Sequence, residues 1–325
     1  MRAVVSSADG AVLADHLQPT PGPDEILVRV HAAALNRADL AMLRGGSHGR
    51  TGGMGLPLGL EWAGEIVSIG AKVAGWKTGD RVMATGGGAY AEYALGSPQR
   101  MLTIPSGMSF ETAATLPVAL NTMHDAIITN GEFKAGQSIL IQGASSGVGL
   151  LAQQIAKHAG AGLVLGSSTN PERRTRLTEF GADLAIDTSD PDWVKQVLAA
   201  TDGKGVDLII DQLSGTFANG NLQATRIGGR IVNVGRLAGD NAPFNFDLHA
   251  LRRINYVGVT FRTRSAEEVA RIVSLVKRDL YAAMAEGKLS LPVDRVFPLE
   301  ETAEALKRMR RNEHFGKIVI TMTGA

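Results

Sequence analysis

One stretch of sequence decides the fold: Ser138-Ile139-Leu140-Ile141-Gln142-Gly143-Ala144-Ser145-Ser146-Gly147-Val148-Gly149. An apolar, β-branched run ends at Gln142, and small residues fill the seven positions after it. Leu150 to Ala159 then has apolar residues at helical spacing. A strand, a glycine-rich turn and a helix in this order predict a dinucleotide-binding turn. The backbone can approach a pyrophosphate there, and the helix N-terminus offers free N–H groups to that anion.

The glycine-rich turn departs from the usual G-x-G-x-x-G spelling. Its three glycine positions are Ala144, Ser146 and Gly149, so only the third is glycine. Such a turn can also bind nothing, but the preceding strand, the following helix and a second strand at Leu163–Leu165 favour a ligand. We therefore predict that a dinucleotide cofactor is bound by four residues of the turn: Ser145, Ser146, Gly147 and Val148.

The composition excludes several classes of protein. The length of 325 residues predicts two domains, and the net charge of +1 gives no reason to expect nucleic acid or an anionic membrane surface as a partner. No apolar run approaches the ~20 residues that cross a bilayer, and Met1 to Val5 enters a strand without a signal-peptide pattern. We therefore expect a cytoplasmic protein. The absence of cysteine excludes disulfides, thiol nucleophiles and cysteine-ligated zinc.

Strands and helices alternate from Ser138 onward, which predicts βα units and a parallel sheet. The expected strands are 138–142, 162–166, 183–186, 206–211, 230–235 and 255–261, and the expected helices are 148–159, 171–180, 191–200 and 215–226. Before this region lies a β-rich unit with short strands at 61–68, 81–85 and 90–95 and a helical segment at Ala32–Leu43. The fold class is therefore α/β, with a doubly wound parallel sheet and a second, β-rich domain.

The end of the second expected strand indicates which cofactor is bound. In NAD-selective domains an acidic residue stands there and holds the ribose hydroxyls. Here the place falls at Gly166-Ser167-Ser168, which has no carboxylate, and Arg173 and Arg174 follow. Hydroxyls and a guanidinium suit a 2′-phosphate, which a carboxylate would repel. We therefore predict NADPH rather than NADH, bound by Ser168 and Arg173. The sequence leaves open which of the two arginines contacts the phosphate.

Several further segments, spread over essentially the whole chain, make it resemble the zinc-free quinone oxidoreductases of the medium-chain dehydrogenase/reductase superfamily. The matching segments are Asn36-Arg37-Ala38-Asp39 with Arg44-Gly45, Gly59-Leu60-Glu61-Trp62-Ala63-Gly64, Gly79-Asp80-Arg81-Val82, Gly88-Ala89-Tyr90-Ala91-Glu92-Tyr93, Ala113-Ala114-Thr115-Leu116-Pro117 with Thr122, the turn at 143–149, Gly205-Val206-Asp207 and Phe315-Gly316-Lys317-Ile318-Val319.

The resemblance implies a domain arrangement and roles for individual residues. Residues 1–118 and 262–325 would form a GroES-like substrate domain, and 119–261 a Rossmann nucleotide-binding domain. Members are dimers or tetramers in which the strand corresponding to Asn255–Phe261 pairs across the interface, so we expect a homodimer or homotetramer. The resemblance further implies catalytic and cofactor-binding residues at the nicotinamide, which are Asn36 and Thr122 beside it and Gly235, Phe261 and Lys317 lining its site.

The resemblance also bears on metal and on the reaction. Zinc members of this superfamily have cysteine where Asn36 stands and histidine where Leu60 precedes Glu61, so we expect no metal site. An already electrophilic acceptor needs no Lewis acid, whereas dehydrogenation of an unactivated alcohol does. The resemblance therefore implies hydride transfer from NADPH to a quinone or an enone, a small-molecule electrophile. The alternatives are an enoyl or alkenal double-bond reductase and a non-catalytic NADPH-binding protein. The sequence identifies no proton donor.

Overall fold

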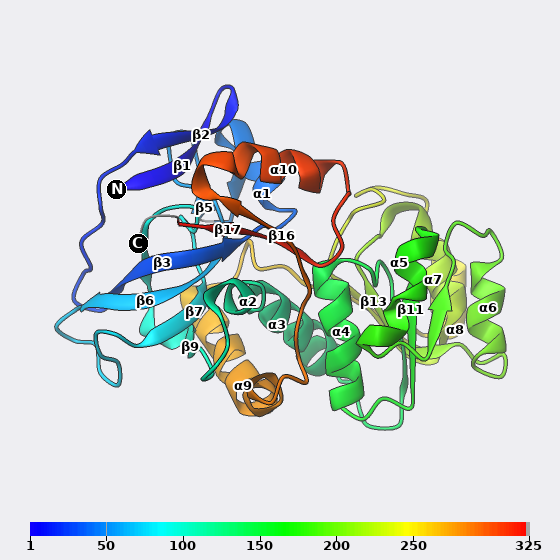
Figure 1. The fold of residues 1–325 in the computed structure, drawn as a ribbon. Coiled ribbons are helices and arrows are strands. Elements are labelled where there is room, and N and C mark those ends of the chain that lie inside the picture. The colour runs from blue at the N-terminus through cyan, green and yellow to red at the C-terminus, as the bar shows by residue number, and fades with distance from the viewer. Residues whose placement is uncertain (50, 323–325) are drawn as a thin grey trace. The chain divides into compact units, whose positions relative to one another are not determined.

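The computed structural model describes residues 1–49 and 51–322, and the chain divides into two compact units. Unit 1 comprises Met1–Val118 and Phe261–Ala325, and unit 2 comprises Ala119–Thr260 (Figure 1). Phe261, which the sequence analysis assigns to the nucleotide-binding domain, falls in unit 1.

Within the described residues, unit 2 is built on one six-stranded parallel sheet. Its strands run in the order β12 (Leu184–Ile186), β11 (Leu163–Ser167), β10 (Ser138–Ile141), β13 (Val206–Asp211), β14 (Thr225–Asn233) and β15 (Asn255–Gly258). Successive strands are added on one side of β10 up to β12 and then on its other side from β13 to β15, which is the strand order of the Rossmann fold. The predicted doubly wound parallel sheet is confirmed.

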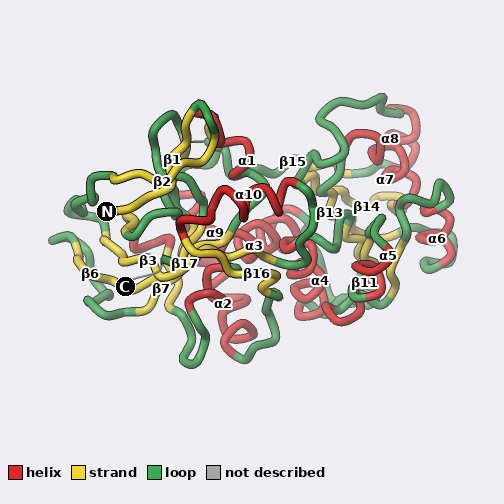
Figure 2. Tube along the Cα trace, turned by 45° about the horizontal axis from the view of Figure 1, so that its top comes forward, coloured by secondary structure: helices red, strands yellow, loops and turns green. Residues whose placement is uncertain are grey.

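Helices connect the strands of unit 2 (Figure 2, red). They are α4 (Gly147–His158), α5 (Pro171–Thr175), α6 (Trp193–Ala199), α7 (Ala218–Ala224) and α8 (Phe246–Arg252), while α3 (Pro117–His124) spans the boundary with unit 1. The predicted apolar face of α4 is buried, with Leu151, Ala152 and Ile155 fully inaccessible to solvent. Burial of this face fixes the helix that follows the glycine-rich turn against the sheet.

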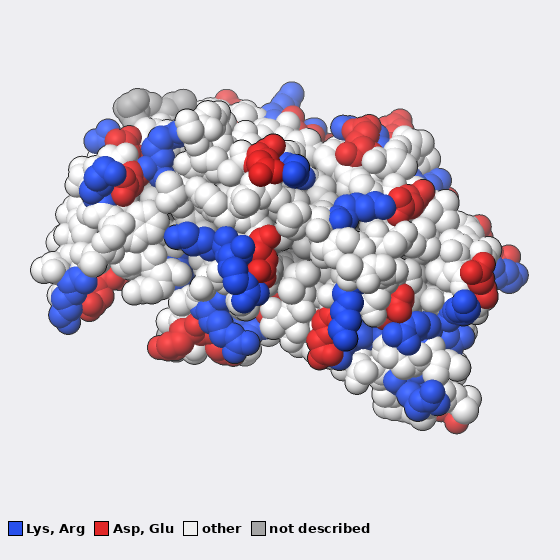
Figure 3. Space-filling model, turned by 90° about the horizontal axis from the view of Figure 1, so that it is seen from below, with Lys and Arg blue, Asp and Glu red and all other residues white. Residues whose placement is uncertain are grey.

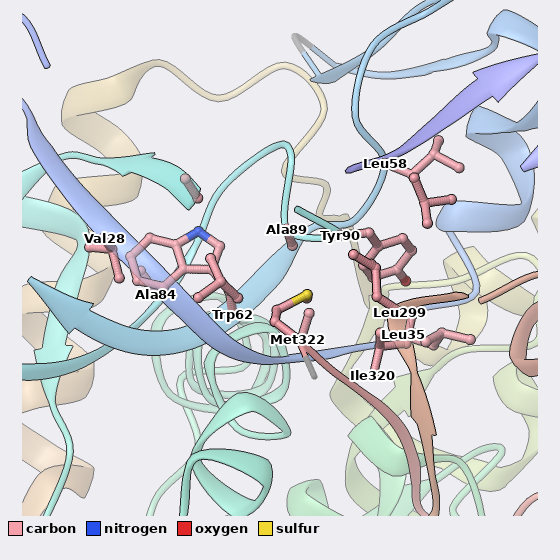
Figure 4. Packing of buried hydrophobic residues seen from close by; sticks show 14 of the residues in the cluster. Val28, Leu35, Leu58, Trp62, Ala84, Ala89, Tyr90, Leu299, Ile320 and Met322 are labelled. Atoms are coloured by element: carbon pink, nitrogen blue, oxygen red, sulfur yellow. The ribbon is translucent and has the colours of Figure 1, made fainter. Parts of the chain in front are cut away.

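The main sheet of unit 1 has strand order β16 (Val293–Pro298), β17 (Lys317–Thr321), β3 (Ile26–Ala34), β6 (Glu61–Ile69), β7 (Arg81–Thr85) and β9 (Met101–Thr103), and β8 (Tyr93–Gly96) also pairs with β3. Unit 1 also contains the strands β1 (Arg2–Ser7), β2 (Gly10–Asp15), β4 (Ser47–His48) and β5 (Thr51–Gly52), which lie outside the main sheet, and the helices α1 (Asp39–Met42), α2 (Phe110–Ala114), α9 (Ala266–Ala285) and α10 (Thr302–Arg310). Trp62 and Tyr90 are fully buried in its core, together with Leu35, Leu299 and Ile320 (Figure 4).

The prediction of helix over Ala32–Leu43 is wrong in its first part. Strand β3 continues to Ala34, and α1 starts only at Asp39. Ala33 pairs with Trp62 of β6, and Ala34 pairs with Val319 of β17. Pairing on both sides of a buried strand outweighs the helix propensity of alanine, which is worth less than about 1 kcal/mol per residue.

The surface carries charges of both signs. On the face shown in Figure 3, lysine and arginine side chains are interspersed with aspartate and glutamate. No helix in the described ranges has both the length and the apolar character needed to cross a membrane.

Gly149 offers a test of how tightly the glycine-rich turn packs. A Cβ atom at this position would lie 2.6 Å from the carbonyl oxygen of Gly143 and 2.8 Å from Cα of Ala144. We expect Gly149→Ala to destabilise the protein by about 1–3 kcal/mol, as overpacking does, and to lower the melting temperature measured by calorimetry. Gly258→Ala is the matched control, because nothing lies within 4 Å of a Cβ there. Equal melting temperatures for the two variants would contradict the close packing.

Candidate active site

A buried group of three polar side chains lies in unit 1, formed by Lys317, Glu61 and Asn36. Lys317 opens β17, Glu61 opens β6, and Asn36 follows β3 by two residues. Lys317 Nζ is 2.6 Å from Glu61 Oε1 and 2.9 Å from Asn36 Oδ1. The side chains of Lys317 and Glu61 are 5% and 0% exposed, whereas Asn36 is partly exposed. The group therefore reaches the surface of the unit at Asn36.

The amide of Asn36 is fixed in one orientation. Its Nδ2 donates to Glu61 Oε1 at 2.9 Å and to the carbonyl oxygen of Ala34 at 3.3 Å, while its Oδ1 accepts from Lys317. A flipped amide would place N–H groups against the ammonium and an oxygen against the carboxylate, so only this orientation satisfies all partners. Glu61 Oε2 in turn accepts from the N–H of Val118 at 2.8 Å. Both N–H groups of the Asn36 amide thus already have acceptors.

Asp39 lies next to this group and is completely buried. Its Oδ2 accepts from the N–H of Asn36 and from the hydroxyl of Tyr90, while Oδ1 is buried without a hydrogen-bond partner. Burial raises the pKa of Asp39 to about 7, although the hydrogen bonds from Tyr90 and Asn36 oppose the shift. Burial and the neighbouring Asp39 raise the pKa of Tyr90 well above its usual value. Asp39 therefore titrates near neutral pH, beside the amide of Asn36.

In unit 2, Ser146 is the N-cap of α4. Its Oγ accepts from the N–H of Gly149 at 3.1 Å and lies 2.9 Å from the carbonyl oxygen of Gly143 and 3.0 Å from Gln212 Oε1. Serine in place of the middle glycine is thus explained by helix capping. The N–H groups of Gly147 and Val148 occupy the first two helical positions, which have no acceptor within the helix. This geometry fits a bound pyrophosphate.

The hydroxyls of Ser145 and Ser168 are brought together, with 3.0 Å between their oxygens. Arg174 donates to the carbonyl oxygen of Ser168 at 3.0 Å and forms an ion pair with Asp187, also at 3.0 Å. The backbone N–H of Arg173 is bound by the side chain of Asn170, the N-cap of α5. Arg174 is thus anchored at the end of β11 with an internal counter-charge, an arrangement that the sequence analysis does not foresee.

The remaining predicted residues are spread over both units. A Cβ atom at Gly235 would lie 2.6 Å from the carbonyl oxygen of Gln212, so this position requires glycine. Thr122 lies in α3 and is partly buried. In unit 1, the ring of Phe261 lies 5.7 Å from the guanidinium carbon of Arg264. The structure thus joins Asn36 to Lys317 in unit 1, and Ser145 to Ser168 in unit 2.

Three members of these groups are not predicted from the sequence as site residues. They are Glu61 and Asp39 in unit 1 and Gln212 in unit 2. Glu61 had a recognisable signal, because a carboxylate opens a strand that continues with buried apolar residues. Asp39 and Gln212 gave no comparable signal, because their partners Tyr90 and Ser146 lie 51 and 66 residues away in the sequence.

Comparisons with known proteins place relatives along the whole chain. Two family models match, "Alcohol dehydrogenase GroES-like domain" over residues 22–106 and "Zinc-binding dehydrogenase" over residues 147–278. A quinone oxidoreductase of Pongo abelii is 30% identical over 289 residues, which is 88% of this chain and 85% of that protein. A mycocerosic acid synthase-like polyketide synthase of Mycolicibacterium smegmatis is 30% identical over 304 residues, which is 93% of this chain but 14% of the synthase.

A solved structure shows the same fold. The crystal structure of an alcohol dehydrogenase superfamily protein from Novosphingobium aromaticivorans matches with a TM-score of 0.89 and 28% sequence identity, and the match covers 99% of both chains. Together with the family models, it shows that the chain contains a GroES-like domain and a Rossmann-like domain.

The name of one family model raises the question of zinc. The resemblance places the zinc ligands of other members at Asn36 and Leu60, but the side chain of Leu60 has no metal-binding atom and the amide oxygen of Asn36 already accepts from Lys317. The neighbouring carboxylate of Glu61 binds the same ammonium. Zinc prefers thiolate, imidazole and carboxylate ligands, and a fixed ammonium at 2.6 Å from the carboxylate repels a second cation. Among residues 1–49 and 51–322, no three His, Asp or Glu side chains form another candidate metal site. The group does not fit zinc.

Asp39→Asn should change how stability depends on pH. The pKa of Asp39 is about 7 in the folded protein against an ordinary 3.8, so the folded state retains a proton that the unfolded state releases. The resulting stabilisation is full below the ordinary pKa and is lost as the pH rises through about 7, at about 1.4 kcal/mol per pH unit. Denaturant titrations at several pH values should therefore show this slope in the wild type but not in Asp39→Asn.

Asp294 supplies a control of opposite sign for that experiment. Burial alone would raise the pKa of Asp294, but hydrogen bonds from Arg308 and the N–H of Phe315 outweigh burial and hold the pKa below its usual value. The contribution of the Asp294 carboxylate to folding stability is therefore present above the ordinary pKa of an aspartate. It is lost as the pH falls through the pKa that Asp294 has in the folded protein. A pH slope that persists unchanged in Asp39→Asn would show that Asp39 is not the buried titrating group.

Proposed function

Because the chain belongs to the medium-chain dehydrogenase/reductase superfamily, as a quinone-oxidoreductase-like member, we propose that it is a zinc-independent, NADPH-dependent quinone oxidoreductase. The superfamily consists of oxidoreductases that use a nicotinamide cofactor. The proposed acceptor is a quinone or a similar conjugated carbonyl compound. Two features of the molecule support the proposal, one in each unit.

The side chains at the end of β11 are the main support for NADPH as the cofactor. Ser168 and Ser145 present neighbouring hydroxyls, and Arg174 is anchored to the carbonyl oxygen of Ser168. The carboxylate of Asp187 is paired with Arg174 at 3.0 Å, and Arg173 stands beside Arg174 in α5. Hydroxyls and guanidinium groups bind a 2′-phosphate well. In this proposal Ser145, Ser146, Gly147 and Val148 hold the pyrophosphate, and Ser168 and Arg173 hold the 2′-phosphate.

The buried polar group of Lys317, Glu61 and Asn36 in unit 1 supports a conjugated carbonyl compound as the acceptor. Lys317 places a fixed positive charge beside Asn36, which stands where zinc members of the superfamily have a cysteine. A conjugated carbonyl is already electrophilic and needs hydrogen bonding rather than a Lewis acid. Bound NADPH supplies the hydride. The residues proposed to position its nicotinamide ring and the acceptor against each other are Asn36, Thr122, Gly235, Phe261 and Lys317.

A second candidate is the reduction of the double bond of an enoyl thioester or alkenal. It is favoured by the match to the polyketide synthase of M. smegmatis, 30% identical over 304 residues. The two functions share cofactor and fold, so only the acceptor distinguishes them. Turnover of NADPH with 1,2-naphthoquinone compared with a 2-enoyl thioester therefore decides between them. Tight binding of NADPH without consumption by any acceptor would instead support a non-catalytic NADPH-binding protein.

We further propose that the chain forms a homodimer or homotetramer through β15. This strand is the last in the sheet order of unit 2, where β14 is its neighbour. Phe246 and Leu251 of α8 are 75% and 66% exposed, and Tyr256 of β15 is 37% exposed. An unpaired strand edge beside exposed apolar side chains is a favourable surface for a second copy of the chain.

Arg173→Ala tests the cofactor assignment. We expect the variant to bind NADPH about 10- to 100-fold more weakly, because it loses a hydrogen bond to a charged group, while its affinity for NADH stays unchanged. Fluorescence titration with each cofactor measures this. Arg176→Ala is the matched control, because Arg176 is exposed and pairs with Glu179. A wild-type protein that binds NADH as tightly as NADPH, or a variant with unchanged preference, would refute the assignment.

A further inference from the structure

The ammonium of Lys317 has one donor to spare. A lysine ammonium carries three N–H groups, and in the described residues Lys317 Nζ donates to two oxygens, Glu61 Oε1 and Asn36 Oδ1. The Asn36 amide, in contrast, uses both of its N–H groups on Glu61 and Ala34. Of the two side chains, Lys317 is therefore the one that can donate to a ligand without breaking an existing hydrogen bond.

The surroundings hold this ammonium in place. Glu61 is fully buried, and its second oxygen is occupied by the N–H of Val118 at 2.8 Å, so the carboxylate is fixed. Lys317 is only 5% exposed, which limits the movement of a long side chain and its screening by water. A charge fixed before the reaction, in a site of low polarity, stabilises developing negative charge more strongly than a mobile surface lysine does.

We propose that the third N–H of Lys317 donates to the carbonyl oxygen of the acceptor and stabilises the oxyanion formed by hydride transfer. Lys317 is then a catalytic residue, while Asn36 and Glu61 position its ammonium. The inference rests on the proposed function and deepens it. Asn36, which the resemblance places beside the nicotinamide, cannot supply this hydrogen bond, because both N–H groups of its amide already have acceptors.

The proposed reduction of the acceptor is balanced in atoms and electrons without a metal ion. Bound NADPH would supply the hydride, with loss of one C–H bond of its nicotinamide, and that hydride with both electrons would form the new bond to the conjugated acceptor. The acceptor is reduced by two electrons and its oxygen becomes an oxyanion, against which the Lys317 ammonium lies. One proton from water then completes the hydroquinone or the saturated carbonyl product, and Lys317 keeps its own proton throughout.

Lys317→Met alone would leave the carboxylate of Glu61 buried without a counter-ion, which destabilises a fold strongly. The informative comparison is therefore the wild type against the double variant Lys317→Met with Glu61→Gln, because either single change would leave one buried charge without its partner. Relative to the wild type, we expect the double variant to lose about 100-fold in kcat/KM for the acceptor, with an unchanged Kd for NADPH. The loss should be larger for a weakly electrophilic enone than for 1,2-naphthoquinone. Lys307→Met, which removes an exposed lysine paired with Glu304, should leave the activity unchanged.

A second readout needs no turnover. 4-Nitrophenol bound in the presence of NADP⁺ imitates the oxyanion when it ionises, and its absorbance reports the ionised fraction. We expect its pKa to fall by about one unit on the wild-type protein, as an opposite charge within hydrogen-bonding range produces, and to return to the value in water with the double variant.

The outcomes separate the inference from the proposed function. An increase in the Kd for NADPH in proportion to the lost activity would make Lys317 a cofactor ligand and overturn the inference. An equal loss for all acceptors with an unshifted 4-nitrophenol pKa would overturn it as well, by showing a structural role only. If the wild-type protein fails to oxidise NADPH with every acceptor tested, the proposed function is refuted. The shift in the pKa of 4-nitrophenol would still report on Lys317.

Discussion

The ion pair between Lys317 and Glu61 is the constraint on which the candidate active site depends. It joins strands that lie 256 residues apart in the chain, and through Asn36 it also fixes the segment after β3. Removing two charges from water costs several kcal/mol for each ion, so a buried pair is weak evidence for stability. Its cost is better explained by what it holds in place, namely one ammonium and one amide in single orientations at the partly exposed position of Asn36.

The glycine-rich turn in unit 2 follows the same principle with neutral groups. Ser146 caps α4 and lies within hydrogen-bonding distance of Gln212 on the loop after β13, so the start of the helix is tied to the neighbouring strand. The backbone of Gly143 and Ala144 packs so closely against Gly149 that a Cβ atom there would lie 2.6 Å from the carbonyl oxygen of Gly143. Backbone N–H groups held in this way can bind an anion without a loss of conformational entropy at the time of binding.

Local patterns in the sequence predict most of unit 2, because each βα unit is short and its apolar period is visible. The strand β13 is found at its observed bounds, Val206–Asp211. The same reasoning fails at Ala32–Ala34, where pairing with distant strands decides the structure. It also fails for the site in unit 1. The sequence offers Asn36 and Lys317 through a resemblance only, since nothing local shows that one carboxylate binds both.

Counting donors changes the chemical interpretation of Asn36. Its side chain type suits a hydrogen bond to an acceptor, but Glu61 and the carbonyl oxygen of Ala34 use both N–H groups. The same count leaves one N–H on Lys317, next to the same partly exposed residue. Lys317 rather than Asn36 is therefore the residue that can donate to an acceptor. The reason is that both side chains donate to the same carboxylate, that of Glu61. In a site without metal ligands, Glu61 is therefore the residue that decides which side chain remains free to act on a substrate.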